Sequence, residues 1–197
     1  MNILILSGSP RKDGNTELLV DAFAKGAAER QHHVEIVSVR DYKVNPCLGC
    51  NACANERHES LLSDGRVQPS VAKGEANGIC VQKDDMAAIY EKMSQTDMLV
   101  IASPVYFYGI SAQLKAVIDR FHNPIRDSFH IKKMALLLVG AASLPELFDA
   151  ILTEYNLCLK FFDIEDAGKV LVRGVKDKGD IKNTDALNEA YKFGLSI

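Results

Sequence analysis

"NILILSGSPRKDGNTELLVDAFAKGAAER", residues 2–30, contains an apolar run, a loop rich in Gly, Ser and Asn, and an amphipathic stretch. Residues 2–7 form a short, almost continuous apolar run, which is typical of a strand buried on both faces. In residues 16–30 apolar side chains recur at helical spacing, at Leu18, Leu19, Ala22, Phe23 and Ala27. Thr16 is the expected cap of this helix. The segment therefore predicts a strand, a turn at its carboxyl end and a helix.

The remainder of the chain repeats this alternation. Further strands are expected at 34–39, 98–103, 133–142 and 168–175. Further helices are expected at 85–93, 111–121, 144–162 and 185–197. Asp84 or Asp85 should start the first of these helices, and Ser111 should cap the second. Strands that alternate with helices imply βαβ crossovers, and hence an α/β fold with a mostly parallel sheet and helices on both faces.

Five strands in this rhythm suit the flavodoxin-like doubly wound sheet, with strand order 2-1-3-4-5. The ligand crevice of such a sheet lies at the carboxyl ends of its first and third strands, where the strand order reverses. The loops that follow residues 2–7 and 98–103 should therefore both be ligand-binding loops.

Length and charge narrow the class of protein. The chain has 197 residues and a formal net charge of -3, which predicts one domain over residues 1–197 and gives no electrostatic reason to bind nucleic acid or a membrane. It shows no apolar run long enough to span a membrane and no signal-peptide pattern at its start. The simplest expectation is a cytoplasmic protein. Residues 54–79 are polar, glycine-rich and without clear periodicity, and predict an inserted loop.

The first loop, "SGSPRKDGNT" (7–16), differs from two well-known phosphate loops. Gly8 and Gly14 are separated by five residues, and no Gly-Lys-Ser/Thr follows. The loop is therefore neither a G-x-G-x-x-G fingerprint nor a Walker A loop. A glycine- and serine-rich turn that opens a helix still presents backbone N–H groups to an anion.

Several side chains of this loop suit a phosphate group. We interpret Ser9, Asn15 and Thr16 as hydroxyl or amide donors. Arg11 would balance the phosphate charge, and Gly14 would let the backbone approach closely.

The second loop, "SPVYFYGIS" (103–111), carries Tyr106, Phe107 and Tyr108 in succession. Three adjacent aromatic residues cannot all point into one core from a loop. They could bind a planar ring, or they could cover the edge of the sheet. A phosphate site on the first loop combined with a flat ring on the second describes flavin mononucleotide, FMN.

The motifs "GSPRKDGNT", "PCLGCNAC", "CVQKDDM" and "SPVYFYGISAQLKAVIDRF" resemble those of the NADPH-dependent FMN reductase family. They are most similar to its branch of iron–sulfur flavoproteins and multimeric flavodoxin-like quinone reductases. The resemblance covers nearly all of the chain except residues 54–79. It implies a flavodoxin-like fold, bound FMN, and two-electron transfer from NAD(P)H to a small acceptor such as a quinone or a flavin. It also implies a homodimer or homotetramer.

The resemblance carries over to individual residues. It places the phosphate at Ser9, Arg11, Asn15 and Thr16, and the isoalloxazine at Pro104, Val105, Tyr106, Phe107 and Gly109. The segment "GAAS" (140–143) would give a third contact with the flavin. No side chain need act as an acid or base in hydride transfer to flavin, so no catalytic residue is assigned.

The segment "CLGCNAC" places Cys47, Cys50 and Cys53 at the C-x2-C-x2-C spacing of loops that bind a [4Fe–4S] cluster. On a helix these positions would rotate away from one another, whereas Pro46 and Gly49 favour a loop. Cys80 is the candidate fourth ligand. In the compact cluster-binding pattern the fourth cysteine follows the third within a few residues, and here 26 residues separate them.

Other interpretations of the cysteines remain open. They could form a zinc site with His58, serve as reactive thiols beside the flavin, or hold no metal. Cys158 lies on an apolar helical face and is expected in the core. The cysteines also distinguish two candidate functions, because a bound cluster converts two-electron flavin chemistry into one-electron transfer. The first function is an FMN-dependent NAD(P)H oxidoreductase, and the second is an FMN/iron–sulfur electron carrier between protein partners.

Overall fold

The computed structural model describes residues 1–54, 56–61, 67–72 and 78–197, and of 56–61 and 67–72 it describes the backbone alone. Five parallel strands form the central sheet in the order β2-β1-β5-β6-β7. They are β1 (Asn2–Ser7), β2 (His33–Ser38), β5 (Met98–Pro104), β6 (Lys133–Val139) and β7 (Glu165–Val172). Counted within this sheet, the order is 2-1-3-4-5, which confirms the flavodoxin-like prediction.

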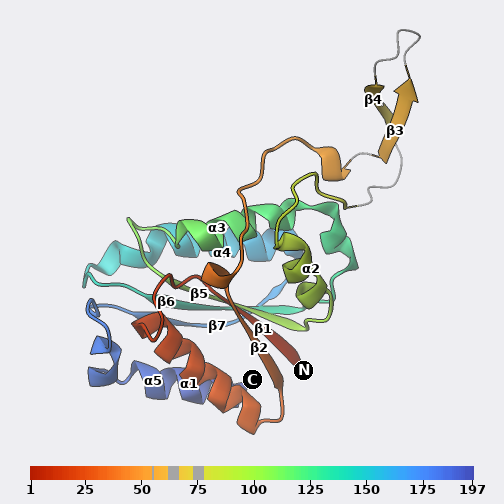
Figure 1. Ribbon diagram of the computed structural model, residues 1–197. Helices are drawn as coiled ribbons and strands as arrows, with labels where there is room; N and C mark the ends of the chain where they lie inside the picture. Colours follow the sequence, from red (N-terminus) through yellow and green to blue (C-terminus); the bar gives the residue numbers. More distant parts are fainter. Residues whose placement is uncertain (55, 62–66, 73–77) are drawn as a thin grey trace.

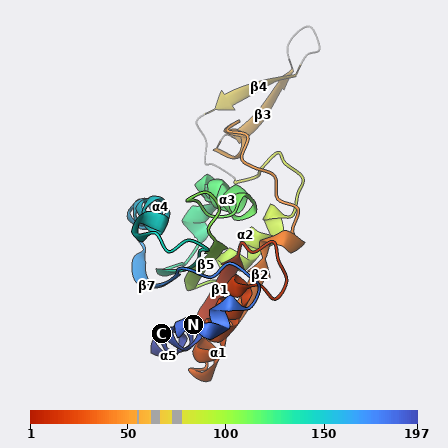
Figure 2. The same cartoon turned by 90° about the vertical axis from the view of Figure 1, so that its left-hand side faces the viewer.

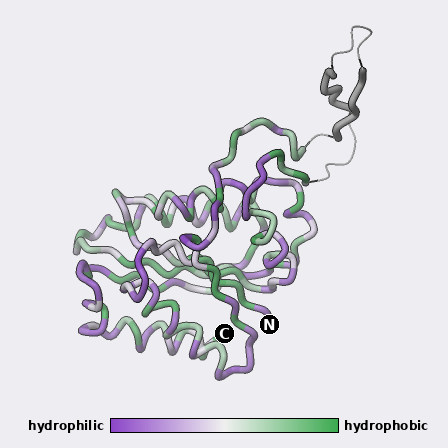
Figure 3. The backbone as a smooth tube through the Cα atoms, in the orientation of Figure 1, coloured by the Kyte–Doolittle hydropathy of each residue, from purple (hydrophilic) through white to green (hydrophobic). Residues whose placement is uncertain are grey.

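Helices cover both faces of the sheet (Figure 1). One face carries α1 (Asn15–Glu29) and α5 (Ala186–Ser196). The other carries α2 (Met86–Ser94), α3 (Ala112–Asp119) and α4 (Asp149–Phe162). Hydrophobic residues follow the central strands and alternate with hydrophilic residues along the helices (Figure 3).

The alternation of side chains along β1 builds two separate cores. Ile3 and Ile5 are buried in the cluster that α1 and α5 cover. Leu4 and Leu6 are buried in the cluster beneath α2, α3 and α4. A strand that is covered on both faces has no polar side, which is why residues 2–7 are almost continuously apolar.

Most boundaries agree with the sequence prediction, but the expected cap of α1 was wrong. The helix begins at Asn15 with Gly14 at its N-cap position, and no side chain of the described residues caps it. Thr16 lies inside the first turn. Ser111 does cap α3, because its hydroxyl accepts a hydrogen bond from the Leu114 N–H at 3.3 Å.

The insertion also differs from its prediction as an irregular loop. β3 (Glu56–Leu61) and β4 (Val67–Ala72) pair antiparallel within it and project from the body of the molecule (Figures 1 and 2). Antiparallel pairing uses backbone groups, so it can form without the apolar alternation that sequence reading looks for.

Candidate functional site

The loops after β1 and β5 lie side by side at the point where the strand order reverses. Ser7 pairs with Ala102, and the Gly8 N–H donates to the Ala102 carbonyl at 2.8 Å. A Cβ atom on Gly8 would lie 2.7 Å from Ser111 Oγ and 2.8 Å from Leu114 Cβ. Position 8 therefore requires glycine, because the first loop runs directly against the start of α3.

Residues 8–14, here called the phosphate loop, fold into a turn with N–H groups at its end. The Ser9 hydroxyl donates to the Arg11 carbonyl at 3.0 Å and accepts from the Arg11 N–H at 3.2 Å. Asp13 has a φ of 51°, which turns the backbone into α1. Because no described side chain caps α1, the N–H groups of its first turn and the positive end of the helix dipole are available to an anion.

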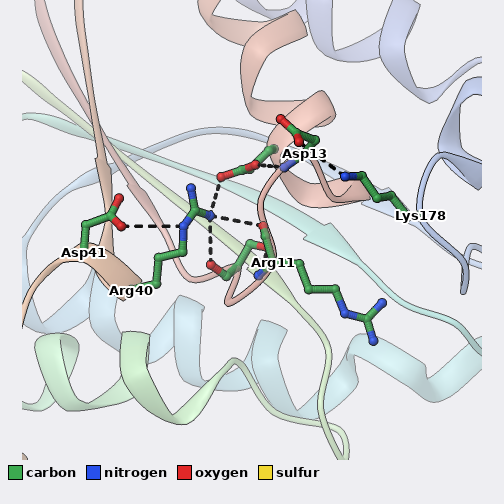
Figure 4. Close-up of polar contacts among 7 residues, drawn as sticks. Arg11, Asp13, Arg40, Asp41 and Lys178 are labelled. Carbon is green, nitrogen blue, oxygen red and sulfur yellow. Dashed lines mark hydrogen bonds and ion pairs between the residues drawn. The ribbon is translucent and has the colours of Figure 1, made fainter.

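Arg40, just after β2, holds this loop from the side and was missed by sequence reasoning (Figure 4). Its Nη1 donates to the carbonyls of Ser9 at 3.3 Å and Arg11 at 3.1 Å. The same nitrogen forms an ion pair with Glu17 in the first turn of α1. The only hint in the sequence was an arginine soon after a strand, and nothing local marked it as part of this site.

Asn15 has a different role from the one its sequence position indicated. Its side-chain amide donates to the Asp177 carbonyl at 2.9 Å, and its Oδ1 accepts the Gly179 N–H at 2.9 Å. The side chain thus fastens the loop after β7 to the first turn of α1. In the loop after β7, Lys178 Nζ lies 3.3 Å from Asp13 Oδ2.

The other predicted phosphate ligands occupy two environments. Ser9 and Thr16 are buried, whereas Arg11 is exposed. The Arg11 side chain extends away from Arg40 (Figure 4), so its guanidinium is free of that cluster.

Residues 106–109, here called the aromatic turn, form a tight reversal. The backbones of Tyr106 and Gly109 exchange two hydrogen bonds, at 2.9 and 3.0 Å. Phe107 and Tyr108 have φ values of 48° and 64°, which is the backbone of a type I′ turn, a place normally taken by Asn and Gly. Such left-handed conformations in bulky residues are costly and concentrate at functional sites.

The aromatic turn is also exposed. Phe107 is 98% exposed, and Tyr106 and Tyr108 are each 45% exposed. Side chains this open do not cover a sheet edge, so that alternative fails. The segment 140–143 is close by, since the Val105 N–H donates to the Val139 carbonyl at 2.8 Å.

Residues 43–53, here called the cysteine loop, come after β2 in the chain and lie near the C-terminal end of α3. Cys47, Cys50, Cys53 and Cys80 all line one pocket. The Gly49 N–H donates to Cys47 Sγ at 3.4 Å. Burial raises the pKa of the Cys53 thiol, a backbone hydrogen bond opposes this, and the charges of neighbouring cysteines raise it further. The structure therefore brings the predicted cysteines together.

The arrangement of these thiols is not that of a site for one metal ion. Among the described side chains, no group of three or more Cys, His, Asp or Glu is close enough to bind one ion. A cubane cluster binds each thiolate through a different iron atom, so its sulfur ligands lie farther apart than those of a single zinc ion. The donors fit a cluster in kind and number, and His58 lies outside the described side chains. Cys158 is half-buried on α4 and not in the core as expected, and burial raises its pKa.

Two carboxylates that the sequence assigned to a helix start anchor the cysteine loop. Asp84 forms an ion pair with Arg120 at 2.5 Å, with both side chains almost fully buried, and accepts the Asn45 N–H at 2.9 Å. Asp85 accepts the Lys43 N–H at 2.6 Å. Burial acts to raise the pKa of Asp84, but the hydrogen bonds and the Arg120 charge outweigh it and lower that pKa.

The two candidate sites lie at opposite ends of α3. Ser111, at its start, contacts the phosphate loop, and Asp119 and Arg120, at its end, line the cysteine pocket. With eight residues, α3 separates its two ends by about 12 Å. The ends of the insertion meet at the cysteine pocket, where the Gly78 N–H donates to the Cys53 carbonyl at 3.2 Å.

Comparison with known proteins gives consistent matches. Residues 1–146 match the family described as NADPH-dependent FMN reductase. An iron–sulfur flavoprotein of Methanocaldococcus jannaschii is 37% identical over 144 residues, which is 72% of this chain and 63% of that relative. This chain thus matches less than two thirds of that protein's length.

An iron–sulfur flavoprotein of Archaeoglobus fulgidus is 35% identical over 201 aligned positions, which span 100% of this chain and 79% of the relative. Among solved structures, an NAD(P)H:quinone oxidoreductase from Methanothermobacter marburgensis superposes with a TM-score of 0.68 at 15% identity. That superposition covers 100% of this chain and 95% of the other. At this identity the likeness supports the fold. No helix among the described residues is long and apolar enough to cross a membrane.

Proposed function

The chain belongs to the NADPH-dependent FMN reductase family, and from this premise we propose that it is an FMN-dependent NAD(P)H oxidoreductase that passes two electrons to a small acceptor such as a quinone or a flavin. The family supports FMN as the cofactor and NAD(P)H as the reductant. The observation that carries the proposal is the juxtaposition of an uncapped helix N-terminus and an exposed aromatic turn at the switch point of the sheet.

The proposed contacts divide between the two loops. The phosphate group would lie on the N–H groups of the phosphate loop and the first turn of α1, near Ser9 and Thr16, with Arg11 as countercharge. There is space for the phosphate beside Gly14, because a Cβ atom placed on this residue would lie no closer than 3.5 Å to another atom. The isoalloxazine would contact Pro104, Val105, Tyr106, Phe107 and Gly109, with residues 140–143 as a third wall.

The work of the protein is binding and orientation. Bound FMN supplies the chemistry of accepting a hydride and releasing two electrons. The aromatic turn orients the ring, and its exposure leaves the ring face open to a nicotinamide and then to an acceptor. Backbone donors beside the ring would stabilise negative charge, so the proposal needs no side chain as acid or base.

The test is anaerobic reduction of the FMN-loaded protein by NADH or NADPH, followed by addition of a quinone or free flavin. Phe107→Ala should lower the turnover, because Phe107 belongs to the aromatic turn. Phe161→Ala is the matched control, since Phe161 is a 59% exposed aromatic residue on α4. Failure of both nucleotides to reduce the bound FMN would reject the proposal.

The second candidate is an electron carrier that holds FMN and a [4Fe–4S] cluster. It is favoured by the convergence of four cysteines on one pocket, and relatives named iron–sulfur flavoproteins add support. Iron and acid-labile sulfide should be measured in anaerobically purified protein. Cys50→Ala should lose both elements and Cys158→Ala should keep them. A wild-type protein without iron would reject this candidate.

We further propose a homodimer or homotetramer in the cytoplasm, with the exposed aromatic turn at a subunit interface. Light scattering that gives a monomer mass at micromolar concentration would contradict it. Residues 1–197 would form one domain, and the 54–79 insertion a lid or partner contact. Replacing 55–78 with a Gly-Ser linker should preserve FMN binding and change acceptor turnover or subunit number.

A further inference from the structure

Arg40 contacts the phosphate loop through carbonyl oxygens, whereas the proposed phosphate would lie on its N–H groups. Its guanidinium reaches two carbonyls of the loop, those of Ser9 and Arg11, and the carboxylate of Glu17 (Figure 4). Glu17 in turn accepts the Asp13 N–H through its other oxygen. A single side chain from the end of β2 therefore joins the loop to the helix that follows it.

We propose that Arg40 is a positioning residue that shapes the phosphate loop and thereby gives the protein its preference for phosphorylated over unphosphorylated flavin. The proposal rests on the proposed function, because it requires FMN to bind at this loop. It assigns a role to a residue outside both loops that the sequence indicated.

Arg40 fixes the direction of one peptide group of the phosphate loop. In a trans peptide the C=O and N–H point in opposite directions. Arg40 holds the Arg11 carbonyl toward itself at 3.1 Å, so the N–H of Lys12 must point to the other side of the loop. The Ser9 hydroxyl also donates to this carbonyl, at 3.0 Å, so loss of the guanidinium would remove one of two anchors. The peptide could then rotate more readily, and a donor aimed at the anion would be held less firmly. Fixing donors before the ligand arrives is what raises affinity for an anion.

Arg40 also offsets a negative charge at the start of α1. Glu17 lies in the first turn of α1, where its carboxylate would repel a phosphate bound to the same helix end. The ion pair with Arg40 offsets that charge while the carboxylate continues to hold the Asp13 N–H. Both side chains are only 18% exposed, so solvent screens the pair less than it screens an ordinary surface ion pair.

The contacts of Arg40 favour a role at the phosphate side of the ligand over general support of the fold. Arg40 contacts the phosphate loop and Glu17, and its Nε lies 3.8 Å from Oδ1 of the adjacent Asp41. It contacts nothing in the aromatic turn among the interactions of the described residues. Loss of Arg40 should therefore affect the phosphate half of the ligand and spare the ring half.

Riboflavin provides the test, because it has the same ring as FMN and lacks the phosphate. Dissociation constants of both flavins should be measured by fluorescence quenching for the wild type, Arg40→Ala, Arg40→Lys and Arg30→Ala. Arg30 is the matched control, since it is an exposed arginine at the opposite end of α1. The free energy of unfolding of each variant should be measured in parallel.

Arg40→Ala should raise the FMN dissociation constant by at least about tenfold, which corresponds to about 1.4 kcal/mol, and the riboflavin constant by less than about twofold. Arg40→Lys should fall between, because an ammonium cannot reproduce the planar fork to two carbonyls. Arg30→Ala should match the wild type. Adding Glu17→Gln to Arg40→Ala should recover part of the FMN affinity, since the uncompensated carboxylate is then gone.

Three results would overturn the proposal. They are an unchanged FMN constant in Arg40→Ala, an equal loss of affinity for both flavins, and a double variant no better than Arg40→Ala. A wild-type protein that binds neither flavin would instead reject the proposed function, so the two failures are distinguishable.

Discussion

The phosphate loop and the cysteine loop each lie against an arginine in an ion pair, Arg40 with Glu17 and Arg120 with Asp84, yet they differ in what they leave open. In the phosphate loop Ser9 bonds to the loop's own backbone and Arg40 holds two of its carbonyls, while the exposed Arg11 and the backbone donors at the start of α1 remain. In the cysteine loop Asp84, paired with Arg120 in the interior, and the exposed Asp85 hold the backbone, and four free thiols line one pocket.

This difference indicates how each site becomes complete. The contacts that hold the phosphate loop are formed within the chain itself, so we expect an anion to dock without rearranging the loop. Neighbouring cysteines raise the pKa of the Cys53 thiol, and a bound cationic centre would relieve this repulsion. We therefore expect substitution of Arg40 to lower the affinity for flavin and substitution of Arg120 to lower the stability of the fold.

The largest effect is expected from Arg120→Met, which leaves the Asp84 carboxylate buried without its partner. Breaking such a pair costs about 3–5 kcal/mol of unfolding free energy. Urea denaturation measures this loss, with Lys115→Met as control because its pair with Asp119 is exposed. FMN affinity should hardly change. A large loss of FMN affinity in Arg120→Met would show that the two ends of α3 are not independent.

The same ion pair predicts an acid dependence. The pKa of Asp84 is lowered in the folded state, from an ordinary value of 3.8. Its contribution to stability is therefore complete above the unfolded pKa and is lost as pH falls through the lower folded pKa. The difference in unfolding free energy between the wild type and Asp84→Asn should be constant near neutrality and shrink below about pH 4. A constant difference down to pH 2 would contradict this.

Arg11→Ala sharpens the comparison from the phosphate side. Removing the guanidinium should weaken FMN binding by roughly 1.5–3 kcal/mol, the range for a hydrogen bond to a charged group. Unfolding free energy should not change, because Arg11 is exposed. Lys12→Ala is the control, since Lys12 is an exposed neighbour of like charge. Equal FMN constants in Arg11→Ala and the wild type would remove Arg11 from the site.

The smallest effect is expected where α3 meets the phosphate loop. Ser111→Ala removes the cap that accepts the Leu114 N–H and should cost about 1 kcal/mol of stability. Thr153→Ala on α4 is the control, because the exposed Thr153 hydroxyl bonds back into its own helix. Thermal unfolding that ranks Thr153→Ala as the more damaging change would contradict the role of the cap.

The sequence predicted the order of the sheet because each buried strand is a continuous apolar run and each helix an amphipathic one. It placed both candidate ligand loops at the switch point, where the structure brings them side by side, because their place follows from topology. It could not show that Arg40 reaches the phosphate loop, or that Asn15 binds a loop 162 residues away. Such contacts depend on how strands pair in space. Asp84 and Asp85 do start α2, as predicted. Their further bonds to Asn45 and Lys43 could not be predicted for the same reason, since these partners are distant in sequence.

The two loops at the switch point should bind FMN, which NAD(P)H then reduces. A titration of the flavin-free protein with FMN, followed by anaerobic addition of NADPH or NADH, measures both properties. We expect saturation at one FMN per chain and loss of the oxidised flavin's visible absorption on addition of a nicotinamide. No saturable FMN binding, or bound FMN that neither nucleotide reduces, would contradict it.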